Sequence, residues 1–141
     1  MALVLPQGRF NNTSDKYIRE YISEKARILA VVGLHVNTFK PHTGTKTSVL
    51  FLQKWNDNQE KGPLCPKLDD YPIFFAVSKK SGKDNSGEYV FIKNGNGQPK
   101  IDKNSHLIID HDLHNQNGEL PEGIAQKFIE WAIREKSSFW I

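Results

Sequence analysis

The chain has 141 residues, a length that fits one ordinary domain, and its hydrophobic content of 38% is enough to build a core. Its single cysteine, Cys65, excludes an internal disulfide framework and fits a reducing cytosol. The net charge of +3 permits nucleic-acid binding without demonstrating it, and no apolar segment approaches the length of a membrane span. We therefore expect a cytoplasmic protein with no membrane association.

Residues 1–34 predict a strand, a helix and a second strand. The continuous apolar run at residues 2–5 is typical of a strand that is covered on both faces. A helix is expected from Thr13 or Ser14, either of which can cap it, with an apolar face that contains Tyr17, Ile18, Tyr21 and Ile22. A second apolar run at residues 28–34 predicts another buried strand. Because a helical crossover joins them, the two strands should be parallel and the crossover right-handed.

The remaining residues predict three further kinds of segment. A third strand is expected at residues 48–54, and the proline-rich stretch 55–72 reads as a connector. Turn-rich sequences then separate three short apolar runs, which predict a small antiparallel meander at residues 73–79, 88–93 and 106–110. The final helix is expected from Pro121, with one face formed by Ile124, Ala125, Phe128, Trp131 and Ala132.

Candidate binding residues lie in the loops at residues 6–13 and 35–47. Both loops follow the carboxyl ends of parallel strands, the edge at which open α/β sheets bind ligands. A cationic and aromatic mixture at this edge suits phosphates and unstacked bases, and the alternative is a solvated loop anchored by Phe39. The side chains expected there are Gln7, Arg9, Phe10 and Asn12 from the first loop, and Phe39, Lys40, His42 and Lys46 from the second.

Two other groups of reactive side chains have simpler structural interpretations. Alternating histidines and carboxylates in residues 106–114 could bind a metal, but their spacing matches no familiar zinc pattern. A polar strand end that runs into a loop is the favoured interpretation. Cys65 lies between prolines with no patterned base nearby, which favours a structural thiol over a nucleophile. We assign no catalytic, cofactor-binding or metal-binding residue.

A combination of short motifs connects residues 1–54 to a known family. The motifs are LPxG, which begins at Leu5, IRxxI at Ile18, Arg19 and Ile22, a strand ending in Gly33 and Leu34, FxPxTGxxT from Phe39 to Thr47, and the strand SVLFLQK. Together they resemble the later part of the catalytic domain of type I restriction-modification methyltransferase subunits, the N-6 adenine DNA methylases. Residues 73–136, which include IIDHDL at 108–113, are similar to the extension that follows this core.

The resemblance implies an α/β fold. The chain would be the C-terminal portion of a Rossmann-like S-adenosylmethionine-dependent methyltransferase sheet, ordered strand–helix–strand–strand, followed by the small antiparallel meander and a C-terminal helix. The implied division is a methyltransferase-like α/β core at residues 1–54, a connector at 55–72, and the meander with its helix at 73–141. The third strand would run antiparallel between the first two.

The resemblance also implies a function, a cofactor and partners. The full-length family transfers a methyl group from S-adenosylmethionine to adenine N6 in DNA and works with restriction and specificity subunits. Neither the glycine-containing cofactor loop nor the (N/D)PP(F/Y) motif occurs in this sequence, so we expect a fragment that is inactive alone and binds no cofactor. An exposed edge at residues 1–5 would permit self-association. The alternative is a non-catalytic module that binds DNA or protein.

Overall fold

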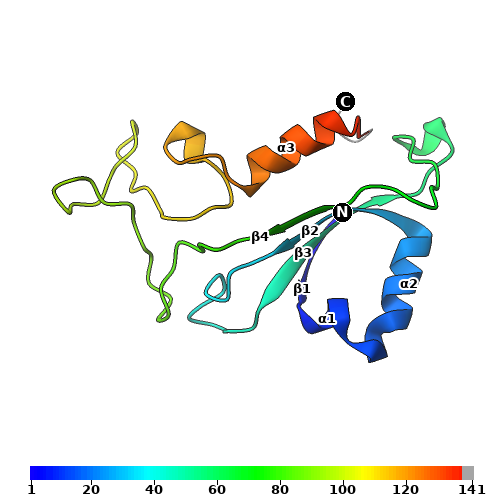
Figure 1. Ribbon diagram of the computed structural model, residues 1–141, viewed down its shortest axis with the longest axis horizontal. Coiled ribbons are helices and arrows are strands. Elements are labelled where there is room, and N and C mark those ends of the chain that lie inside the picture. The colour runs from blue at the N-terminus through cyan, green and yellow to red at the C-terminus, as the bar shows by residue number, and fades with distance from the viewer. Residues whose placement is uncertain (138–141) are drawn as a thin grey trace.

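The computed structural model describes residues 1–137, which form one mixed sheet with helices on both faces (Figure 1). Within these residues the sheet has four strands in the order β1-β3-β2-β4. The strands are β1 (Ala2–Pro6), β2 (Ala26–Gly33), β3 (Thr47–Lys54) and β4 (Phe74–Val77). The helices are α1 (Gly8–Asn11), α2 (Lys16–Lys25) and α3 (Ile124–Arg134), with short 3-10 turns η1 (Thr13–Asp15), η2 (Gln59–Lys61) and η3 (Gln116–Gly118).

The position of β3 confirms the strand order expected for the first part of the chain. β3 pairs antiparallel with β1, where Leu3 lies opposite Leu50, and antiparallel with β2, where Val31 lies opposite the same Leu50. The strands β1 and β2 are therefore parallel, and β3 lies between them. This arrangement brings the carboxyl ends of β1 and β2 to the same edge of the sheet as the first residue of β3.

The pairing of β4 corrects the sequence-based expectation. Residues 73–79 were expected to join an antiparallel meander, whereas β4 pairs in parallel with β2, with Phe74 opposite Ala30 and Val77 opposite Gly33. This pairing occupies the side of β2 that β3 leaves free. It also places the ring of Phe74 against α3, with its centroid 5.4 Å from that of Phe128 and 5.7 Å from that of Trp131.

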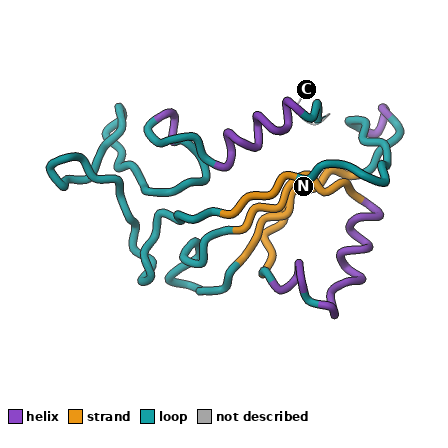
Figure 2. Tube along the Cα trace, in the orientation of Figure 1, coloured by secondary structure: helices purple, strands orange, loops and turns teal. Residues whose placement is uncertain are grey.

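The rest of the expected meander is present only as isolated antiparallel bridges. Phe91 bridges Ile109, and Ser81 bridges His111, but neither 88–93 nor 106–110 forms a continuous strand. Figure 2 shows that the segment between β4 and α3 is almost entirely loop. Closely spaced turns along this segment interrupt the pairing between its apolar runs. Each run therefore forms single bridges and no continuous strand.

One face of the sheet packs against α1 and α2. The buried cluster on this face consists of Ala26, Leu50 and Leu52, and Ile22 of α2 packs against it. The structure corrects two details of this helix. Tyr17 and Tyr21 are 69% and 63% exposed, so the buried face is narrower than expected. No side-chain cap is formed by Thr13 or Ser14, since both belong to the turn η1 that precedes α2.

The opposite face packs against α3, which lies across the sheet from α1 and α2 in Figure 1. Trp131 and Ala132 are buried, as the expected apolar face of this helix requires. An apolar cavity of about 440 Å³ remains between α3 and the strands β2 and β3. Its lining includes Val32, Phe51 and Phe128. Helix α3 is therefore not packed tightly against the strands along its whole length.

Candidate nucleic-acid interface

The carboxyl ends of three parallel strands meet at one edge of the sheet. The amide of Gln7, after β1, donates to the carbonyl of Lys46 at 3.0 Å, and the amide of Leu34, after β2, donates to Thr47 at 2.9 Å. After β4, the amide of Ser78 donates to the carbonyl of Gly33 at 2.8 Å. The loops that follow β1, β2 and β4 are therefore fixed beside one another, and Figure 1 shows the last two leaving the same end of the sheet.

The segment after β1 was expected as a loop at residues 6–13, but it contains the short helix α1, which carries Arg9 and Phe10. This first loop is held by an ion pair and an apolar anchor. Arg9 Nη1 lies 2.9 Å from Oδ1 of Asp15, a carboxylate whose side chain is only 8% exposed. Arg19 donates to the carbonyls of Arg9 and Asn12 at 3.2 and 2.8 Å. Phe10 packs against the cluster beneath the sheet. Arg9 still has 57% of its side chain exposed, so it can hold Asp15 and face a ligand at the same time.

The second loop presents its candidate residues on a turn that is fixed from within. The hydroxyl of Thr38 donates to the carbonyl of His35 at 2.7 Å, and the amide of Asn37 donates to Nδ1 of the same histidine at 3.2 Å. Phe39 is 36% exposed, and His42 and Lys46 are exposed. Phe39 is therefore mostly covered while part of its surface reaches solvent.

A third loop, residues 78–88, was missed by sequence reasoning. It reaches the edge because β4 is parallel to β2, a pairing that the sequence did not indicate. Asp84 closes its turn, since Oδ1 accepts the amides of Ser86, Gly87 and Glu88 at 2.8, 2.9 and 3.0 Å. The hydrogen bond from the Ser86 hydroxyl, with those amides, lowers the pKa of Asp84. Lys83 lies in this turn, with Nζ 5.6 Å from the ring centre of Tyr89.

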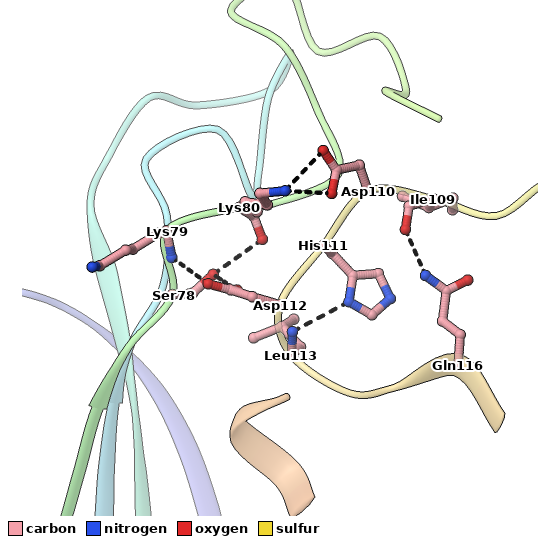
Figure 3. Close-up of polar contacts among 9 residues, drawn as sticks. All are labelled: Ser78, Lys79, Lys80, Ile109, Asp110, His111, Asp112, Leu113 and Gln116. Atoms are coloured by element: carbon pink, nitrogen blue, oxygen red, sulfur yellow. Dashed lines mark hydrogen bonds and ion pairs between the residues drawn. The ribbon is translucent and has the colours of Figure 1, made fainter. Parts of the chain in front are cut away.

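The histidine and carboxylate segment is joined to the end of β4 by polar contacts (Figure 3). The carboxylate of Asp112 accepts the hydroxyl of Ser78 and the amide of Lys79, each at 2.6 Å. Its own carbonyl accepts the amide of Ile124, the first residue of α3, at 3.0 Å. Asp112 therefore ties the end of β4 to the start of α3. In residues 1–137 no group of three or more potential ligands is arranged to hold a metal ion.

Two of the three histidines in residues 106–114, His111 and His114, act as acceptors for the backbone. Nδ1 of His111 accepts the amide of Leu113 at 3.2 Å, and Nδ1 of His114 accepts the amide of Gln116 at 3.1 Å. The two imidazole rings are 4.4 Å apart. Burial, with a smaller contribution from His114, lowers the pKa of His111 below 6.5, so the ring favours its neutral form.

Cys65 lies away from this edge, in the connector. It is 2% exposed and exchanges two backbone hydrogen bonds of 2.8 Å with Asn56. Burial raises the pKa of its thiol; Arg27 lowers it by a smaller amount, and Asp57 adds a small further increase. A buried, protonated thiol is a poor nucleophile, which agrees with the structural role favoured by the sequence.

The chemistry available at the edge is cationic and partly aromatic. The side chains placed there include Arg9, Lys40, Lys46 and Lys83, and Phe39 directly precedes Lys40 in the sequence. Such groups can bind phosphate oxygens and stack on exposed bases, whereas the edge does not assemble an activated nucleophile. In residues 1–137 no helix is both long enough and apolar enough to cross a bilayer.

Comparison with known proteins identifies one family. The sequence model of the N-6 DNA methylase family matches residues 1–117, which is most of the chain and includes all four strands of the described sheet. No curated protein matches the chain.

Proposed function

Because the chain belongs to the N-6 DNA methylase family, we propose that it forms the later part of the methyltransferase domain of a type I modification subunit. Such a subunit, in its full-length form, transfers a methyl group from S-adenosylmethionine to adenine N6 in DNA. The family match over residues 1–117 is the observation that carries the proposal. The order β1-β3-β2, with an antiparallel strand between two parallel ones, supports a Rossmann-like relationship.

The proposed division of the chain has three parts. Residues 1–54 form the α/β part of the methyltransferase core, residues 55–72 are a connector, and residues 73–141 are an extension. By sequence β4 belongs to the extension, yet it hydrogen-bonds to β2 of the core. We therefore propose that the extension completes the DNA-facing edge by adding a strand, β4, to the sheet of the core.

The residues present do not fit S-adenosylmethionine. The cofactor carries a positively charged sulfonium, and the edge described here is lined by Arg9, Lys40, Lys46 and Lys83, which would repel it. The motifs that hold the cofactor and the target adenine in this family are also missing from the sequence. In this proposal the chain contributes DNA contacts to the full-length enzyme and neither binds the cofactor nor transfers a methyl group by itself.

DNA is the proposed partner of the edge. Arg9, Lys40, His42 and Lys46 would contact phosphates, with Gln7 and Asn12 beside them, and Phe39 is exposed enough to meet a base. Phe10 would support the first loop from beneath, because it packs against the core. Positive side chains of this kind contribute affinity that does not depend on DNA sequence, which suits a subunit whose target site is chosen by a separate specificity subunit.

The free side of β1 suggests where further protein contacts lie. In residues 1–137 β1 pairs only with β3, and Val4 is 53% exposed. An open strand edge is a template for another strand. We propose that the free side of β1 pairs with a strand from the remainder of the enzyme. A second copy of the chain would take that place when the remainder is missing.

Two titrations of the isolated chain test the proposal. Fluorescence anisotropy with duplex DNA should show binding that weakens steeply as salt is raised. Isothermal titration with S-adenosylmethionine should show no binding at micromolar concentrations. Tight cofactor binding would overturn the claim that this chain lacks the cofactor site, and an absence of DNA binding at low salt would overturn the claim about the edge.

A further inference from the structure

The loops after β2 and β4 are locked together by a buried asparagine. Asn37 is 5% exposed, and its Nδ2 donates at 3.2 Å both to the carbonyl of Lys83 and to Oδ1 of Asn85. The two loops also approach too closely for any side chain at Gly87, because a Cβ atom there would lie 2.6 Å from the backbone nitrogen of Pro41. The relative position of the loops is therefore fixed by direct contact.

Two lysines cross this contact in opposite directions. Nζ of Lys40 donates to the carbonyl of Asn85 at 2.7 Å, and Nζ of Lys83 donates to the carbonyl of Lys40 at 2.8 Å. Each ammonium group carries three N–H donors, and a carbonyl is a neutral acceptor. Both side chains are consequently held in place while their charges and several of their donors remain available.

No carboxylate neutralises these lysines within residues 1–137. The ion pairs of this region involve other residues, such as Arg9 with Asp15 and Lys80 with Asp110. The nearest acidic side chain in the sequence, Asp84, directs its Oδ1 into its own turn. Two positive charges are thus fixed at a loop junction, with hydrogen bonds to neutral carbonyls and, for Lys83, the ring of Tyr89 nearby. Neither contact cancels the charge, which favours the binding of an anion.

We propose that Lys40 and Lys83 form a preorganised clamp for the phosphodiester backbone of duplex DNA. The proposal rests on the proposed function and extends it, because it assigns a DNA contact to the loop after β4. The clamp needs both loops. The loop after β2 supplies the ammonium of Lys40 and the carbonyl that orients Lys83, and the loop after β4 supplies the ammonium of Lys83 and the carbonyl of Asn85 that orients Lys40. Phosphate is the matching ligand because its oxygens accept from several N–H donors at once.

The test is a salt titration of duplex DNA binding by the chain and by Lys40→Gln, Lys83→Gln and the double variant. Each lost phosphate contact should reduce the slope of log affinity against log salt by about 0.9. The double variant should therefore lose about 1.8 of slope and bind more weakly at every salt concentration. Lys61→Gln, an exposed lysine in the connector, is the matched control and should leave the slope unchanged.

Two further variants separate charge from position. Lys40→Arg with Lys83→Arg retains both charges and should keep the slope close to that of the parent chain. Gly87→Ala keeps both lysines but forces the loops apart, so it should weaken DNA binding while circular dichroism still reports the folded sheet. A Gly87→Ala chain that is folded and binds as tightly as the parent would contradict the need for a fixed clamp.

The outcomes distinguish this inference from the proposed function. If the parent chain binds DNA with a steep salt dependence and the double Lys→Gln variant keeps the same slope, the clamp is wrong and the wider DNA-facing edge still stands. If the parent chain shows no salt-dependent DNA binding, both the clamp and the proposed edge are wrong. Inorganic phosphate that binds the chain as tightly as duplex DNA does would likewise overturn the assignment to DNA.

Discussion

The sheet and the segment between β4 and α3 hold their backbones in different ways. In the sheet, β2 and β3 pair along most of their length over a buried cluster that includes Leu50 and Leu52. In the segment, three turns instead use a side-chain oxygen that accepts amides two and four residues further on, at Asp84, Asn94 and Asp102. The sheet therefore depends on apolar burial, whereas the segment depends on individual polar side chains.

The largest effect is expected from a cavity in the sheet. Leu52 is 3% exposed within the buried cluster, so Leu52→Ala should lower the free energy of unfolding of the whole chain by about 2–5 kcal/mol. Urea denaturation followed by circular dichroism measures this change. Leu68→Ala, at an exposed connector position, is the control and should have little effect. Equal losses in the two variants would show that burial does not govern the stability of the sheet.

The next effect is expected where one carboxylate joins the two regions. Asp112→Ala removes the acceptor of the Ser78 hydroxyl and of the Lys79 amide, hydrogen bonds worth about 1.5–3 kcal/mol when the acceptor is charged. Hydrogen exchange should accelerate at the amides of Ile124 and Ala125 at the start of α3. Leu50 in the sheet should stay protected. Asp69→Ala, an exposed carboxylate in the connector, should leave all of these rates unchanged.

Acid should loosen the segment before it affects the sheet. The pKa of His111 is lowered below 6.5 in the folded chain, so on acidification the unfolded state takes up a proton first. Stability from the neutral ring is present above about pH 6.5 and is lost as the pH falls through the folded pKa. The protection factor of the Leu113 amide, which corrects for the slower intrinsic exchange in acid, should therefore fall as the pH drops below about 6.5.

His111→Asn is the matched variant for this pH dependence, because it has no proton to gain in that window. In this variant the protection of the Leu113 amide should not change with pH over the range in which the parent chain loses it. His114, Asp110 and Asp112 also face or adjoin the ring, and the carboxylates partly oppose the shift. If the variant and the parent respond identically to acid, His111 is not the group responsible.

The smallest effect is expected at a single turn of the segment. Hydrogen bonds from the amides of His106 and Asn104 lower the pKa of Asp102, so its contribution is present above pH 3.8 and is lost as the pH falls through the lower folded value. Asp102→Ala should accelerate exchange at those two amides alone. Detection by NMR of a change at Val31, in the middle of the sheet, would mean that the turn and the sheet are coupled.

The sheet was the more predictable region. Continuous apolar runs at residues 2–5, 28–34 and 48–54 are the signal of buried strands, and the structure has strands at all three places. The position of β3 came from a resemblance to a family and not from periodicity. β4 was predicted as a strand with the wrong partner, because alternation along Phe74–Val77 fixes which side chains face α3 and leaves the identity of the neighbouring strand open.

The candidate interface was predictable in part, because the parallel strands β1 and β2 could be recognised from their apolar runs. The loops after β1 and β2 were expected at one edge, and the structure places them there. Lys83 was missed because its loop reaches the edge only through the parallel pairing of β4. The ion pair of Arg9 with Asp15 and the packing of Phe10 were also missed, since loop composition does not distinguish a residue that anchors a turn from one that faces a ligand.

The buried thiol of Cys65 makes the connector easy to monitor. The side chain is enclosed and its ionisation is suppressed, so an alkylating reagent should modify it only when the backbone bridge to Asn56 opens. Because no other cysteine is present, mass spectrometry would give one labelling rate without any engineered probe. A change in that rate on adding duplex DNA would report how far an event at the lysine-rich edge propagates to the other end of the sheet.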